Sequence, residues 1–180
     1  DGIIVSGGAG FIGSNLVQRL IENSAYRIYV IDNLCLGKKE NLNSSKRIEF
    51  INLDLANKNK TKNTIKEIHK KSKIKEVWHM AANSDIPAGV LDPEVDFENT
   101  FLSTFNLFNS LETEELEKIH FASSSAIYGD HSLTKITEST APLFPISNYG
   151  SFKLASEAVL SSFVEKNNSK LYIYRFPNVV

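Results

Sequence analysis

The sequence predicts an α/β fold built on a doubly wound parallel sheet. Two observations support this prediction: six short apolar runs alternate with helix-length segments along the 180 residues, and a glycine-rich turn directly follows the first run. Strands that alternate with helices, joined by right-handed crossovers, form a parallel sheet with helices on both faces. The sequence contains no interdomain linker and no internal repeat, so residues 1–180 are expected to form one domain.

Six runs rich in isoleucine, valine and aromatic residues are expected to be strands. They lie at residues 3–5, 27–31, 48–53, 75–80, 118–123 and 171–176. Short and nearly continuous apolar runs are typical of strands that are buried on both faces of a parallel sheet.

Helical periodicity appears in the segments between these runs, at residues 11–21, 61–71, 92–111 and 149–164. The second of these helices is short and basic, and its lysines are expected to face solvent. At the start of the third, an Asp-Pro pair supplies a capping side chain and a residue suited to the first helical position.

The long third helix carries an aromatic stripe. Phe97, Phe101, Phe105 and Phe108 are spaced by four, four and three residues, which places all four on one helical face. We expect this face to lie in the core or in a subunit interface rather than against a ligand.

The glycine-rich turn has the spacing and context of a dinucleotide-binding fingerprint. Gly7, Gly10 and Gly13 follow an apolar run and precede an amphipathic helix. The first glycine permits the tight turn, the second lets the backbone approach a pyrophosphate, and the third lets the helix pack close to the strand. The positive end of the helix then faces the phosphates. An ordinary turn is the alternative interpretation.

Asp32 ends the second run, about 20 residues after the fingerprint, where an acidic side chain accepts hydrogen bonds from the adenosine ribose. Its charge would repel a 2′-phosphate, so NAD is favoured over NADP, although two lysines follow closely. The alternative is that Asp32 only begins a turn with Asn33. Asp54 and Leu55, at the end of the third run, can reach the adenine.

Ser124, Tyr149 and Lys153 form a second constellation. Tyr149 and Lys153 share a helical face because they are four residues apart, and Ser124 follows the fifth strand at the edge where ligands bind. A tyrosine with the usual pKa of about 10 is a poor base at neutral pH, but a neighbouring ammonium favours the phenolate, and so would the positive ring of an oxidised nicotinamide. Lys153 is therefore predicted to activate Tyr149 and hold the nicotinamide ribose, with Ser124 bonded to the reacting oxygen. Two unrelated surface residues are the alternative.

The composition argues against several classes of function. There are 20 Lys and Arg against 21 Asp and Glu, so a net charge of −1 gives no electrostatic basis for binding nucleic acid or an anionic membrane. No apolar run approaches the roughly 18 residues of a membrane span. Cys35 is the single cysteine, so no internal disulfide and no thiolate metal site is expected, and a cytoplasmic location fits. Both ends lie directly beside a strand, as in a fragment of a longer protein.

Six stretches together resemble the extended short-chain dehydrogenase/reductase family, and most closely its nucleotide-sugar epimerases. They are Gly7-Gly8-Ala9-Gly10-Phe11-Ile12-Gly13-Ser14, Asp32-Asn33-Leu34, His79-Met80-Ala81-Ala82, Ser123-Ser124-Ser125-Ala126-Ile127-Tyr128-Gly129-Asp130, Tyr149-Gly150-Ser151-Phe152-Lys153 and Arg175-Phe176-Pro177-Asn178-Val179. The resemblance covers essentially the whole chain and implies an NAD-binding Rossmann fold from which most of a C-terminal substrate domain is missing. His79 is interpreted as a structural residue.

The resemblance also implies further roles. The residues expected to contact NAD, in addition to those above, are Phe11, Ile12, Asn33, Leu34, Gly37, Met80, Ala81, Ala82, Ser84, Asn99 and Phe176. Asn178 is expected to reach the substrate diphosphate, while Ser124 and Tyr149 contact the sugar. The helices over residues 92–111 and 149–164 match the pair that forms a four-helix bundle between two subunits, which implies a homodimer.

The activity implied by the resemblance is NAD-dependent epimerisation at C4 of a UDP-hexose. Hydride would leave C4 to give a transient 4-keto sugar and return to its opposite face, so NAD would stay bound. Related dehydratases carry Asp-Glu after the catalytic hydroxyl, where this chain has Ser125 and Ala126, which weakens the dehydratase interpretation. Two competing interpretations are a nucleotide-sugar oxidoreductase and a non-catalytic NAD-binding scaffold.

Overall fold

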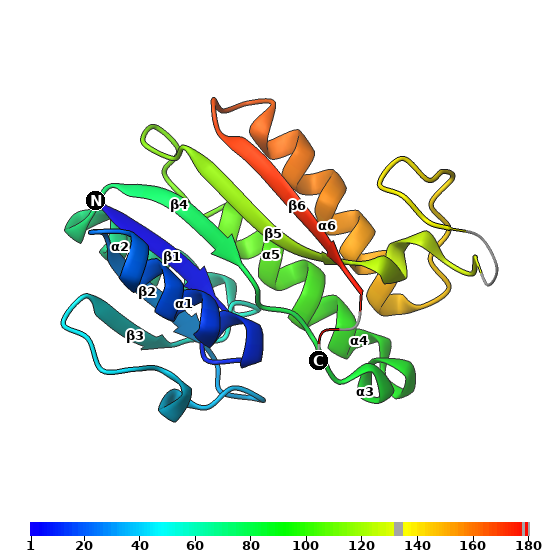
Figure 1. Ribbon diagram of the computed structural model, residues 1–180, viewed down its shortest axis with the longest axis horizontal. Coiled ribbons are helices and arrows are strands. Elements are labelled where there is room, and N and C mark those ends of the chain that lie inside the picture. Colours follow the sequence, from blue (N-terminus) through cyan, green and yellow to red (C-terminus); the bar gives the residue numbers. More distant parts are fainter. Residues whose placement is uncertain (132–134, 178, 180) are drawn as a thin grey trace.

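The chain forms a six-stranded parallel sheet, as the sequence predicts (Figure 1). The structure is a computed structural model that describes residues 1–131, 135–177 and 179. The strands are β1 (Gly2–Ser6), β2 (Arg27–Asp32), β3 (Ile48–Asn52), β4 (Ile74–His79), β5 (Lys118–Ser124) and β6 (Lys170–Phe176). Their order is β3-β2-β1-β4-β5-β6, and all neighbours pair in parallel. The order reverses between β1 and β4, and a doubly wound sheet binds ligands at the carboxyl ends of the strands at such a point.

Helices cover the sheet on both faces. They are α1 (Phe11–Asn23), α2 (Lys58–Lys71), α3 (Ile86–Leu91), α4 (Pro93–Asp96), the π turn η2 (Phe97–Leu102), α5 (Ser103–Phe108) and α6 (Asn148–Val164), with 3₁₀ turns η1 (Lys39–Asn41) and η3 (Ser125–Tyr128). Figure 1 shows α1 on one face and α5 and α6 on the other. Residues at or directly after the carboxyl ends of β1, β4 and β5 line one cavity.

Alternate residues of β1 enter two separate apolar cores, because successive side chains of a strand point to opposite faces. Ile3 and Val5 pack with Val17 of α1. Ile4 belongs to the larger core on the other face, which includes Ile65 of α2. All five side chains are at most 1% exposed, so the strand that leads into the glycine turn is rigidly held from both sides.

The long third helix agrees with its prediction at its start and departs from it in the middle. Asp92 caps the helix by accepting a hydrogen bond from the backbone of Glu94 at 3.0 Å. A π turn then holds more residues than an α turn, and it separates α4 from α5. The helix ends at Phe108, before the predicted end at residue 111.

The aromatic stripe therefore contains three phenylalanines instead of four. Phe97, Phe101 and Phe105 stack in sequence, with ring centroids 6.0 and 6.3 Å apart. Phe108 is 2% exposed and packs edge-on against His79 in the core. The prediction of one shared face is wrong for Phe108 because it assumed α-helical rotation throughout, whereas the π turn over residues 97–102 changes the rotation per residue.

The short helix α3 was not predicted. Asp85 caps it by accepting a hydrogen bond from the backbone of Ala88 at 3.1 Å, and a proline lies in its first turn. The same Asp and Pro signals identified the start of the next helix, so this helix was detectable. No helix in the described part of the chain has the length and apolar character that a membrane crossing needs.

Candidate active site

The three fingerprint glycines are each required for a different reason. Gly7 has a φ of +68°, and a Cβ there would lie 2.6 Å from the backbone nitrogen of Ala81. A Cβ at Gly13 would lie 2.1 Å from the carbonyl oxygen of Gly7. A Cβ at Gly10 would meet that same oxygen at an ordinary 3.4 Å and would otherwise face open space among the described residues. Gly7 and Gly13 thus shape the turn, while Gly10 leaves open space in front of α1.

Asp32 connects the glycine turn to the loop that follows β2. One carboxylate oxygen accepts a hydrogen bond from the backbone of Ala9 at 2.9 Å, and the other accepts one from Leu34 at 2.8 Å. The turn interpretation is therefore correct in part, but the bond to Ala9 shows a second role. Because an ionised carboxylate offers about four acceptor positions, Asp32 retains capacity for the two hydroxyl groups of a ribose. Gly37 lies against this carboxylate, since a Cβ there would be 3.1 Å from it.

A cavity of about 600 Å³ lies along the carboxyl edge of the sheet, within the usual size of a ligand site. The predicted residues that line it are Gly7, Gly10, Phe11, Ile12, Gly13, Asp32, Asn33, Gly37, Asp54, Leu55, Met80, Ala81, Ala82, Ser84, Asn99, Ser124, Tyr149, Lys153 and Phe176. Leu34 does not line the cavity. Its backbone N–H donates to the Asp32 carboxylate, which does line it. Asn178 lies outside the described residues. The structure therefore brings the fingerprint and the Ser-Tyr-Lys constellation to one cavity.

Several residues of the cavity wall were missed by the sequence analysis. They are Asp85, Ile86, Ala88, Val95 and Ser103, from the segment after β4 and the following helices, whereas Asn83 lies within the predicted stretch 80–84. Asn83 orders this segment: its amide donates to the Asp96 carboxylate at 2.7 Å, and its backbone donates to Thr100 at 3.2 Å. Asp96 is 2% exposed. A buried aspartate that faces an asparagine 13 residues earlier has no short-range sequence signal.

Lys153 is buried at the inner end of the cavity. It is 2% exposed, its Nζ donates to the carbonyl of Ala122 at 2.6 Å, and it lies 5.7 Å from the centroid of the Tyr149 ring. Burial lowers the pKa of Lys153 to about 7, although the negative charge of Glu157 opposes the shift. An ammonium near neutrality can therefore gain or lose its proton within the physiological range.

Tyr149 does not behave as the sequence analysis expected. Burial raises the pKa of Tyr149 above its usual value, and the charge of Asp96 adds to this, whereas a hydrogen bond with Ser124 opposes it. Lys153 is not among the groups that set this direction in the isolated chain: its Nζ donates to the Ala122 carbonyl and lies 5.7 Å from the centroid of the ring. The phenol is therefore protonated at neutral pH unless a further positive charge enters the cavity.

His79 has the structural role that the sequence analysis assigned to it. Its side chain is 0% exposed, and its ring nitrogens bond the hydroxyl groups of Ser6 at 2.5 Å and Thr104 at 2.8 Å. Burial lowers the pKa of His79 to about 3, with a smaller contribution from Lys153. A neutral histidine thus joins β1, β4 and α5 below the cavity floor.

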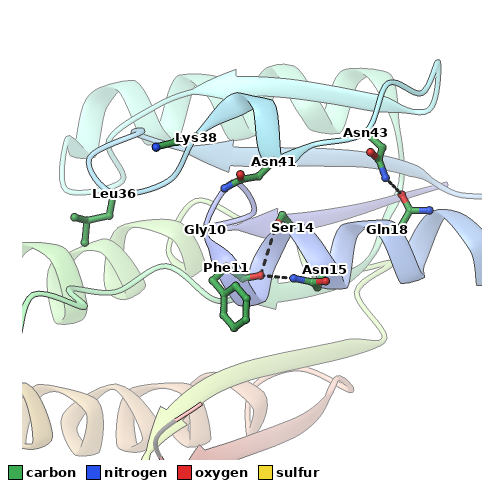
Figure 2. A pocket seen from close by; sticks show the side chains of 9 residues that line it. All are labelled: Gly10, Phe11, Ser14, Asn15, Gln18, Leu36, Lys38, Asn41 and Asn43. Atoms are coloured by element: carbon green, nitrogen blue, oxygen red, sulfur yellow. Dashed lines mark hydrogen bonds between the residues drawn. The ribbon is translucent and has the colours of Figure 1, made fainter. Parts of the chain in front are cut away.

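A second cavity, of about 530 Å³, lies on the outer side of the glycine turn (Figure 2). Its lining is Gly10, Phe11, Ser14, Asn15, Gln18, Leu36, Lys38, Asn41 and Asn43. Figure 2 shows Asn43 bonded to Gln18; this distance is 2.7 Å. The Asn41 amide donates to the carbonyl of Ala9 at 2.8 Å. These amides already have partners, so we interpret this surface as the support of the turn.

The fold and the cavity together define an α/β protein of the Rossmann type, in which Ser124, Tyr149 and Lys153 line the same cavity as the glycine turn. The model of the NAD dependent epimerase/dehydratase family matches residues 3–180. The chain belongs to this family.

Several relatives and structural neighbours are 4-epimerases by name. A putative UDP-glucose 4-epimerase of Methanocaldococcus jannaschii is 34% identical over 98% of this chain and 55% of its own length. The UDP-glucose 4-epimerase of Bacillus subtilis is 33% identical over 92% of this chain and 49% of its own length. The Thermus thermophilus UDP-glucose 4-epimerase, solved with NAD, is 34% identical with a TM-score of 0.84, over 97% of this chain and 54% of its own. The chain spans about half the length of the curated relatives it matches.

Proposed function

We propose that this chain is the NAD-binding Rossmann domain of a nucleotide-sugar 4-epimerase. The observation that carries the proposal is the continuous cavity that joins the glycine turn and Asp32 at one end to Ser124, Tyr149 and Lys153 at the other. A dinucleotide is the kind of ligand long enough to connect two such ends. The relatives named above support a UDP-hexose as the substrate.

The residues present fit NAD. The open space at Gly10 suits a pyrophosphate at the N-terminus of α1, and Asp32 suits an unphosphorylated ribose, since its carboxylate would repel a 2′-phosphate. When bound, NAD supplies a reversible hydride acceptor and a positive ring. That positive charge favours the Tyr149 phenolate, which the isolated chain disfavours.

The chain's own residues then handle the proton. Tyr149 as phenolate removes the proton of the C4 hydroxyl of the sugar and returns it at the end of the cycle. Ser124 donates a hydrogen bond to the same oxygen, and Lys153 orients the nicotinamide ribose. Ser125 and Ala126 cannot act as the acid and base of a dehydratase, so epimerisation is favoured over removal of water. Asn178 is proposed to bind the substrate diphosphate.

A homodimer in the cytoplasm completes the proposal. Phe97 and Phe105 are 39% and 40% exposed, and Phe152 of α6 packs beside the same row, 5.6 Å from Phe97 and 6.3 Å from Phe101. An aromatic row across two neighbouring helices is a surface suited to a second copy of itself.

Two measurements test the proposal. Isothermal titration of this chain should show NAD binding and NADP binding at least tenfold weaker, and equal affinities would contradict the role of Asp32. The full-length protein, with no added cofactor, should invert C4 of a UDP-hexose by NMR with no net NADH, and Tyr149→Phe should abolish turnover while NAD binding persists. Stoichiometric NADH would indicate an oxidoreductase, a 4-keto-6-deoxy product would indicate a dehydratase, and bound NAD without turnover would indicate a scaffold.

A further inference from the structure

A buried carboxylate lies next to the catalytic constellation and belongs to none of the predicted site residues. Glu157 of α6 is 6% exposed. Arg175 of β6 binds it in a two-pronged contact, Nε to Oε1 at 3.2 Å and Nη2 to Oε2 at 2.9 Å. The hydroxyl of Ser123 also donates to Oε1, at 2.5 Å. A charge this deeply buried is costly unless it is paired, and Arg175 and Ser123 supply the partners of Glu157.

Two successive residues at the end of β5 are held by two charged side chains of α6. Lys153 donates to the carbonyl of Ala122, and Glu157 accepts from the hydroxyl of Ser123. Lys153 and Glu157 lie one helical turn apart and therefore on the same face. The next residue of the strand is Ser124. The position of its hydroxyl relative to the Tyr149-bearing helix is thus fixed by this pair of contacts.

The same carboxylate dominates the charge around Lys153. The groups that face the ammonium are Glu157 and Tyr149 from α6, the Phe121 ring of β5 at 4.9 Å, and the neutral His79 of β4. Glu157 is the anionic member of this set. Its charge opposes the effect of burial on the Lys153 pKa.

Arg175 limits how much of this negative charge reaches Lys153. Its guanidinium also donates to the hydroxyl of Tyr128 and to the carbonyl of Glu138, both at 3.0 Å. The side chain of Arg175 is 21% exposed, whereas that of Glu157 is 7% exposed. Glu157 is therefore the buried centre of the network and Arg175 is its outer counter-ion.

We infer that Glu157 is a positioning residue of this site, which fixes Lys153 and the Ser123–Ser124 strand end against α6 with Arg175 as its counter-ion. The inference deepens the proposed function and rests on it for the roles of Ser124 and Lys153. Its physical content, the coupling between Glu157, Arg175 and Lys153, can be measured without substrate or cofactor.

The test is the titration of the Lys153 ammonium, followed by NMR in lysine-labelled ¹⁵N protein between pH 5 and 9, with the signal assigned by Lys153→Arg. The wild-type midpoint is expected near 7. Glu157→Gln should lower it by roughly one pH unit, because the variant keeps the shape but removes the opposite charge. Arg175→Gln should raise it, because Glu157 then acts on Lys153 alone. Glu165→Gln, which removes an exposed carboxylate at the end of the same helix, should leave it unchanged.

Opposite shifts in the two variants distinguish this coupling from general loosening of the structure, which would move both midpoints the same way. Unchanged midpoints, or shifts in one direction, would overturn the inference. If Glu157→Gln fails to fold, Arg175→Gln is compared with Arg175→Lys, which keeps the positive charge. Coupling predicts a raised midpoint only in Arg175→Gln, whereas loosening would raise it in both variants. In full-length enzyme, Glu157→Gln should lower kcat with little change in KM. An inactive wild-type enzyme would refute the proposed function, while the titration would still decide the role of Glu157.

Discussion

Gly10 and Gly13 should respond in opposite ways to the same substitution, which tests the physical roles of the fingerprint directly. Gly13→Ala places a Cβ 2.1 Å from the carbonyl oxygen of Gly7 and 2.7 Å from the Cα of Gly8. Both neighbours are backbone atoms within a tight turn, so α1 has to move. Overpacking of this kind costs about 1–3 kcal/mol or more. For a chain of this size, 3 kcal/mol corresponds to a fall of roughly 6–12 °C in Tm.

Gly10→Ala should leave the fold almost unchanged. Its φ of −76° and ψ of 178° suit any residue, and the added Cβ meets the Gly7 oxygen at 3.4 Å. Loss of glycine at the helix N-cap costs up to about 1 kcal/mol, and lower entropy of the unfolded chain returns about 0.4–1 kcal/mol. The free energy of unfolding should therefore change by less than about 0.5 kcal/mol. The methyl group enters the cavity, so NAD affinity should fall at least tenfold.

Urea denaturation and isothermal titration with NAD measure the two effects separately. Gly13→Ala should lower the free energy of unfolding. Titration of the protein that remains folded then shows whether the substitution also weakens NAD binding directly. Wild-type NAD affinity in Gly10→Ala would refute the close approach of a pyrophosphate at this position. Wild-type stability in Gly13→Ala would refute the packing argument.

Three further outcomes are expected. Asp32→Ala should lower the free energy of unfolding by about 1–3 kcal/mol, because the backbone N–H of Ala9 loses its acceptor. The same variant should bind NAD at least tenfold more weakly. An unchanged free energy in urea denaturation and an unchanged affinity in isothermal titration would contradict the role of this carboxylate. Because the folded pKa of His79 is about 3 and its ordinary value is 6.5, the unfolded chain binds the proton first, so stability should fall by roughly 4 kcal/mol as the pH drops from 6.5 to 3. His79→Gln should flatten this pH dependence of urea unfolding. Phe105→Glu should convert a dimer to a monomer, as measured by light scattering. Phe144→Glu should leave the dimer intact, because this position is 70% exposed and lies outside the aromatic row. A monomeric wild-type protein would contradict the proposed assembly.

The parallel sheet and the cofactor end of the site were predictable because their signals are local. Gly7, Gly10 and Gly13 are close in sequence, and the apolar run before them identifies the strand that presents them. Tyr149 and Lys153 are four residues apart, so helical geometry alone brings them together. The right-handed crossover rule predicts helices on both faces of the sheet, while the order of the strands is known from the structure.

The electrostatics of the site could not be predicted from such spacings. The pKa of Tyr149 depends on burial and on Asp96, and neither is visible from the four-residue motif. Lys153 finds its partner in a backbone carbonyl of β5, and every residue has such a carbonyl. The π turn that removes Phe108 from the aromatic stripe likewise leaves no signal in the spacing of the phenylalanines.

The hydrogen bonds around Ala9 determine how the coenzyme preference can be redesigned. The Ala9 N–H is bound by Asp32, and its carbonyl accepts from the backbone of Lys38 and the amide of Asn41. The segment that would meet the adenosine is therefore part of the wall that supports the phosphate turn. Replacing Asp32 alone by a smaller, neutral residue would remove the repulsion of a 2′-phosphate. The same substitution would also leave the Ala9 N–H without its acceptor and so destabilise the phosphate turn. A variant that prefers NADP therefore requires residues 32–41 to be replaced together, and the new segment must supply another acceptor for the Ala9 N–H.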